Sequence, residues 1–85
     1  MTSYRVLVCT EILQLAKPSP RERNLILSFL DHLGKNPHQK GDYEEKDDVG
    51  RPVQIKVITK YALTYWTDHA AKEVKVTHFE LADQK

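Results

Sequence analysis

A capped helix is the sequence feature that most constrains how this chain can fold. Ser19-Pro20-Arg21-Glu22 combines the pattern of a capping box with proline at the first helical position. Apolar residues then recur at spacings of three and four and form one stripe, which consists of Leu25, Ile26, Phe29, Leu30 and Leu33. Gly34 stands where a left-handed residue often ends a helix, and Asn36-Pro37 prevents continuation. The sequence predicts a helix from Pro20 to Leu33 whose apolar stripe needs a second layer to pack against.

Beyond Pro37 the apolar residues alternate with polar ones, which is the period of a β-strand. We expect strands at 42–46, 52–59, 61–67 and 73–79, with a turn at 47–51. Residues 3–10 are apolar on nearly both faces, which predicts a central strand, and the segment that follows fits either more strand or a short helix. The expected fold is α+β, with a helix layer packed on one face of a twisted antiparallel sheet.

Composition restricts the class of protein. The chain has 85 residues, of which 40% are hydrophobic, and this suits a single domain over residues 1–85. Its single cysteine, Cys9, cannot form an internal disulfide; we expect it to be buried and unreactive, and the protein to be cytoplasmic. No apolar run is long enough to cross a membrane, and the first ten residues do not resemble a signal peptide. The four histidines are scattered, so we expect neither a metal nor a cofactor.

The open face of the predicted sheet is the candidate binding surface. Strand parity predicts that Lys56 and Lys75 project from this face, and that Val53, Ile55 and Val57 pack towards the helix. Tyr65 and Trp66 have opposite parity on one strand, so one of them should face away from the helix, where aromatic rings can stack on RNA bases.

His78 is the only histidine on a predicted strand. Its parity matches that of Val74 and Val76, which directs it towards the helix unless a bulge changes its direction. A structural role and a catalytic role are both open, since histidine titrates near neutral pH.

The order of these elements, together with Leu-Gly-Lys-Asn-Pro at 33–37, Gly41-Asp42-Tyr43 and above all the segment 41–83, resembles the RelE/ParE superfamily of type II toxin–antitoxin toxins. The resemblance covers nearly the whole chain and is strongest with the RelE/ParE-like plasmid-stabilisation subgroup. It implies helices on one side of a twisted antiparallel sheet. It also implies an antitoxin protein as partner, and as activity either cleavage of messenger RNA in the ribosomal A site or inhibition of DNA gyrase.

The resemblance further implies which residues act. The catalytic group would be His78, Lys56 and Arg51, and the RNA-binding group Lys60, Lys75, Tyr65 and Trp66. Two positions depart from the family pattern: strand 61–67 lacks the arginine that many members carry, and Phe79 follows His78 where some nucleases have tyrosine.

Three functions remain open from the sequence. The leading one is a RelE-like mRNA endoribonuclease neutralised by an antitoxin. The second is a non-catalytic member of the fold that inhibits gyrase or only binds its antitoxin, and the third is a structural protein that self-associates through its sheet. The net charge of +1 favours the second and third, because proteins that bind RNA are usually more basic.

Overall fold

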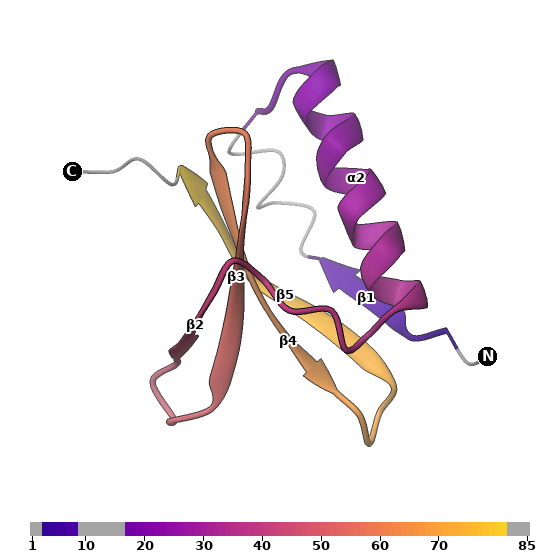
Figure 1. Ribbon diagram of the computed structural model, residues 1–85, viewed down its shortest axis with the longest axis vertical. Helices are drawn as coiled ribbons and strands as arrows, with labels where there is room; N and C mark the ends of the chain where they lie inside the picture. The colour runs from indigo at the N-terminus through magenta and orange to yellow at the C-terminus, as the bar shows by residue number, and fades with distance from the viewer. Residues whose placement is uncertain (1–2, 9–16, 82–85) are drawn as a thin grey trace.

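The computed structural model describes residues 3–8 and 17–81, which form a five-stranded sheet with one helix packed on one face (Figure 1). The elements are β1 (Arg5–Val8), α2 (Pro20–Lys35), β2 (Tyr43–Lys46), β3 (Pro52–Ile58), β4 (Tyr61–Asp68) and β5 (Glu73–Leu81). Their order in the sheet is β1-β5-β4-β3-β2. Among the residues described, no helix is long and apolar enough to cross a membrane. The predicted α+β fold with a helix layer on one face is confirmed.

The sheet is mixed, which corrects the prediction of a wholly antiparallel one. Strands β2 to β5 form the predicted antiparallel meander, but β1 pairs in parallel with β5 and lies at the edge instead of the centre. The chain continues from β1 through α2 to β2 at the opposite edge of the sheet, so the strand beside β1 is β5, the last strand of the chain, and the two run parallel.

Helix α2 begins as the capping box predicts. The Ser19 hydroxyl accepts a hydrogen bond from the Glu22 backbone N–H at 3.2 Å, and the Glu22 carboxylate accepts one from the Ser19 N–H at 2.9 Å. The buried side chains of the stripe are Ile26, Leu30 and Leu33. Leu25 is 44% exposed, so fewer residues of the apolar stripe pack against the sheet than the sequence predicts.

Gly34 does not end the helix in a left-handed conformation, as the sequence had suggested. It lies inside α2 and is buried, and the helix continues to Lys35. A Cβ atom at Gly34 would lie 3.0 Å from the carbonyl oxygen of Tyr4 and 3.3 Å from the side chain of Val6. The Gly34 carbonyl also accepts a hydrogen bond from the Tyr4 N–H at 2.8 Å. Glycine is needed here because the chain leading into β1 crosses close to the helix.

The register of β3 reverses the predicted direction of its side chains. Ile58 pairs with Tyr61 across the β3–β4 turn, and both belong to the core beneath α2. Lys56 pairs with the core residue Leu63 and therefore faces the helix layer. Val53 and Ile55 lie on the opposite, open face, where they are nonetheless buried in the twisted sheet.

A bulge in β5 decides where His78 points. Tyr65 pairs with Val76 whereas Thr64 pairs with His78, so Thr77 is an extra residue on β5. An extra residue shifts the alternation of side chains by one position. Val76 and Phe79 consequently both face the core, and His78 is exposed on the open face.

Candidate functional site

The open face brings together four of the seven predicted site residues. Trp66 on β4 lies opposite Lys75 on β5, and two residues earlier on β4 Thr64 lies opposite His78. Residues two apart on a strand share a face and are about 7 Å apart along it. Arg51, the residue just before β3, contacts Trp66 from the side of β4 opposite to Lys75. His78 therefore shares a surface with a group of two cations and one aromatic ring.

Arg51 is held against Trp66 by Asp47. The guanidinium carbon of Arg51 lies 4.0 Å from the centre of the Trp66 ring, and its Nε donates to the Asp47 carboxylate at 2.8 Å. The other oxygen of this carboxylate accepts from the backbone N–H of Arg51 at 2.9 Å and of Val49 at 3.1 Å. Partial desolvation opposes ionisation of Asp47, but these bonds keep its pKa below the usual value. The turn and the arginine side chain are thereby fixed together.

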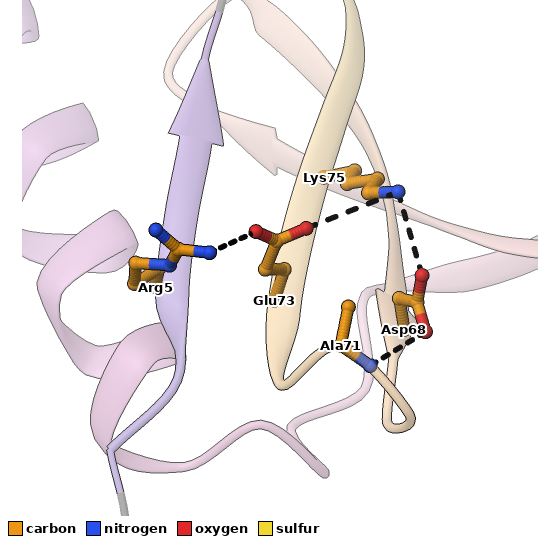
Figure 2. A network of polar contacts seen from close by, with 5 residues as sticks. All are labelled: Arg5, Asp68, Ala71, Glu73 and Lys75. Atoms are coloured by element: carbon orange, nitrogen blue, oxygen red, sulfur yellow. Dashed lines mark hydrogen bonds and ion pairs between the residues drawn. The ribbon is translucent and has the colours of Figure 1, made fainter.

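Lys75 is held by carboxylates on both sides, as Figure 2 shows. Its Nζ lies 3.4 Å from Asp68 and 3.9 Å from Glu73, and 5.0 Å from the centre of the Trp66 ring. Glu73 is also paired with Arg5 on β1. A backbone hydrogen bond from Ala71 and the nearby Lys75 keep the pKa of Asp68 below its usual value, although burial acts in the other direction. The network fixes Lys75 beside Trp66, and the two carboxylates offset the positive charge of Lys75.

Among the residues that the structure describes, the imidazole of His78 makes one hydrogen bond, and this bond decides which ring nitrogen carries the proton. Its Nδ1 lies 3.1 Å from the hydroxyl oxygen of Thr77, and that hydroxyl donates to the carbonyl oxygen of Thr64 at 3.4 Å. A hydroxyl that donates its only proton to Thr64 can accept only from a protonated Nδ1. We therefore assign the proton of the neutral ring to Nδ1, which leaves the lone pair of Nε2 available as a base.

His78 lines a shallow pocket that carries four carboxylates and one lysine, Lys46, besides uncharged residues. The pocket has a volume of about 250 Å³ and lies between β2, β3, β4 and β5. Four carboxylate residues line it, which are Glu45, Asp47, Asp48 and Glu80. Like charges repel, so these carboxylates disfavour a phosphate group nearby.

Three predicted site residues do not join this group. Tyr65 is fully buried in the core; its hydroxyl donates to the Gln39 carbonyl oxygen at 3.1 Å, and burial raises its pKa to about 12. Lys56 faces the helix layer, where it lies 5.7 Å from the ring of Phe29. Lys60 lies on the β3–β4 turn, 3.9 Å from the Glu22 carboxylate at the start of α2.

All four lysine and arginine residues predicted for the site have a carboxylate partner within the chain. The pairs are Arg51–Asp47, Lys56–Asp42, Lys60–Glu22 and Lys75–Asp68. Exposed pairs of this kind contribute at most about 1 kcal/mol each, so a ligand can compete for the cations. They also reduce the positive field that would attract RNA from a distance.

The described residues hold no group of metal ligands, and they do not include Cys9. Within residues 3–8 and 17–81, no three His, Cys, Asp or Glu side chains are grouped so that they could hold a metal ion. Cys9, and most of the segment left open between strand and helix, lie outside the described residues.

Comparison with known proteins identifies the fold. No protein-family model matches the sequence, and no curated protein matches it significantly. Among solved structures, the chain is similar to one in the crystal structure of the archaeal RelE–RelB complex from Pyrococcus horikoshii OT3, with a TM-score of 0.79 and 16% sequence identity. The match covers 99% of this chain and 100% of that one. The protein therefore has the α+β fold of RelE, as the resemblance in its sequence predicted.

Proposed function

We propose that this protein is the toxin of a type II toxin–antitoxin pair and that it cleaves messenger RNA on the ribosome with the open face of its sheet. The observation that carries the proposal is the bulge at Thr77, which turns His78 onto the face that holds Arg51, Trp66 and Lys75. The RelE fold supports it. Ribosomes and messages lie in the cytoplasm, so we propose that compartment, with residues 1–85 acting as one domain.

Each open-face residue has a role in this reaction. Nε2 of His78 accepts the proton of a 2′-hydroxyl, whose oxygen attacks the adjacent phosphorus; the bond to the 5′-oxygen breaks, and that oxygen takes a proton from water. Arg51 and Lys75 offset the charge that develops on the phosphate oxygens. The exposed part of Trp66 offers apolar surface to a neighbouring base.

The test is expression of the protein alone in a bacterial host, followed by mapping of message ends on translating ribosomes. We expect growth arrest and cleavage, with the rate reduced roughly 10²–10⁴-fold in His78→Ala, the usual contribution of an acid–base group. The matched control is His32→Ala, because His32 is an exposed histidine on α2, which covers the other face of the sheet. Well-folded wild-type protein that cuts no message on ribosomes would refute the nuclease.

We further propose an antitoxin partner that carries an acidic segment, because such a segment can bind the sheet cations. Substitution of Lys56 or Lys75 can show which surface the acidic segment binds, since these two lysines lie on opposite faces of the sheet. If the segment covers the open face, Lys75→Ala weakens the complex and Lys56→Ala does not. Calorimetry with the product of an adjacent short reading frame measures both, and the reverse order would place the antitoxin on the helix layer.

The acidic lining of the His78 pocket favours a second candidate, a non-catalytic protein that inhibits gyrase or only binds its antitoxin. Four carboxylates beside His78 oppose the approach of a phosphodiester. On this alternative the antitoxin complex forms with normal affinity, but no message is cut and His78→Ala has no effect beyond stability. The cleavage assay above therefore decides between the two candidates.

A further inference from the structure

The guanidinium of Arg51 is held from one side only. Its Nε donates to Asp47, whereas its two Nη nitrogens make no hydrogen bond or ion pair with any residue that the structure describes. The side chain is 41% exposed, so these nitrogens are open to solvent. This edge carries the donors that bind a phosphate through two parallel hydrogen bonds.

Two contacts fix the direction of that edge. Trp66 supports the flat side of the guanidinium, whose carbon lies 4.0 Å from the ring centre. Asp47 holds the inner edge of the guanidinium. Two backbone hydrogen bonds close the turn that carries Asp47: the Asp47 N–H donates to the Arg51 carbonyl at 2.9 Å, and the Gly50 N–H donates to the Asp47 carbonyl at 3.0 Å. Gly50 has a φ of 81°, which the turn requires and glycine adopts readily. The arginine is thus oriented before any ligand arrives.

Lys75 differs from Arg51 in this respect. Its ammonium group lies between two carboxylates, those of Asp68 and Glu73, whose side chains are 24% and 13% exposed. A ligand anion must displace at least one of these partners to reach Lys75. Binding at the outer edge of Arg51 requires no such displacement.

We propose that Asp47, Arg51 and Trp66 form a preorganised receptor for one backbone phosphate of single-stranded RNA, in which Arg51 binds the phosphate and Asp47 and Trp66 are positioning residues. The identity of the ligand as RNA rests on the proposed function; the receptor itself rests on the contacts above. Asp47 assists binding here although it is an anion, because it holds the inner edge of the guanidinium and leaves the outer edge free.

The test is binding of a 2′-O-methyl RNA oligonucleotide, which cannot be cleaved, to the isolated protein. Trp66 is the only tryptophan in the chain, so its fluorescence reports directly on this site. Asp47→Asn retains an oxygen that can accept from the backbone N–H groups of the turn but loses the acceptor for Nε. Asp48→Asn is the matched control, since it removes the same charge from an exposed neighbour, while the ion pair of Arg51 is with Asp47.

We expect Asp47→Asn to bind the oligonucleotide about fivefold more weakly than Asp48→Asn does, the effect of one ordinary hydrogen bond. Arg51→Ala should change the emission of Trp66, and should lower the slope of log affinity against log salt by about 0.7, as expected for one lost phosphate contact on a single strand. Thermal melting of each variant verifies that the fold is kept.

Three results would overturn the receptor: Asp47→Asn binding as tightly as Asp48→Asn, an unchanged salt slope in Arg51→Ala, or no binding by the wild type. Failure of the proposed function is a separate result. If Arg51-dependent binding is found but ribosome-bound message is not cut, the receptor stands and the nuclease does not. If message is cut equally by wild type, Asp47→Asn and Arg51→Ala, cleavage by this protein stands, but the receptor and the role of Arg51 in offsetting the phosphate charge do not.

Discussion

The tautomer of His78 is the most direct test of the chemistry that we assign to the open face. The assignment of the proton to Nδ1 depends on the Thr77 hydroxyl, which accepts from Nδ1 at 3.1 Å and donates to the Thr64 carbonyl. Thr77→Val removes the hydroxyl and keeps both the shape of the side chain and its preference for strands. Thr77→Ser is the control because it keeps the hydroxyl.

The expected size of the effect follows from the exposure of this contact. A net hydrogen bond contributes about 0.5–1.5 kcal/mol, and the exposed position of both residues favours a value near or below 1 kcal/mol. A free energy of that size changes the ratio of the two tautomers by at most about fivefold. If Nε2 is the base, cleavage should slow by no more than this factor in Thr77→Val, far less than in His78→Ala.

Nuclear magnetic resonance tests the assignment without any assay of activity. In a neutral imidazole, the ¹⁵N shifts of the two nitrogens show which one carries the proton. We expect the proton on Nδ1 in the wild type and in Thr77→Ser, and a shift towards Nε2 in Thr77→Val. A wild-type proton on Nε2 would mean that Thr77 donates to His78, and His78 would then be unable to act as the proposed base.

Further predictions concern stability. Leu33→Ala should cost about 2–5 kcal/mol in urea unfolding because Leu33 is fully buried, whereas Leu25→Ala, at a site 44% exposed, should cost less than about 1 kcal/mol; equal losses would contradict the packing described. Ser19→Ala should cost about 1 kcal/mol by the same measurement, through loss of the helix cap. The raised pKa of Tyr65 contributes stability below about pH 10, and this stability disappears as the pH rises towards 12. Tyrosinate absorbance and loss of circular dichroism should therefore rise together in that range, and both changes should be smaller in Tyr65→Phe. The lowered pKa of Asp68 contributes stability that is lost as the pH falls below about 4, and Asp68→Asn should flatten this acid side of the melting-temperature profile.

Local patterns in the sequence predict the elements of this fold well. The capping box places the start of α2 at Pro20, and alternation places the four strands of the meander. These features depend on residues near one another in the chain, where helix caps and strand periodicity operate. The position of β1 depends on its pairing with β5, some 68 residues away, and no local pattern specifies that pairing.

The side chains of β3 show why alternation of apolar and polar residues alone does not predict which face of the sheet each residue occupies. Val57 and Ile58 are both apolar, so the sequence is compatible with either residue facing the core. The turn at Thr59 and Lys60 settles the choice by placing Ile58 opposite Tyr61. Lys56 therefore faces the helix layer. The predicted alternation of β3 was wrong by one position, and for this reason Lys56 does not lie on the open face.

His78 presents the opposite case, because one extra residue brings it into the site. Counting from Val74 and Val76 directs His78 towards the helix, and nothing in the local sequence marks Thr77 as an inserted residue. The insertion becomes evident only from the partners on β4: Phe79 packs in the core opposite Leu63, and the chain must gain a residue between Val76 and Phe79 for both to face α2. The core thus determines the bulge, and the bulge determines the exposed histidine. A variant that deletes Thr77 should therefore keep Phe79 buried and His78 exposed, because Val76, His78 and Phe79 would then alternate regularly opposite Tyr65, Thr64 and Leu63 without a bulge.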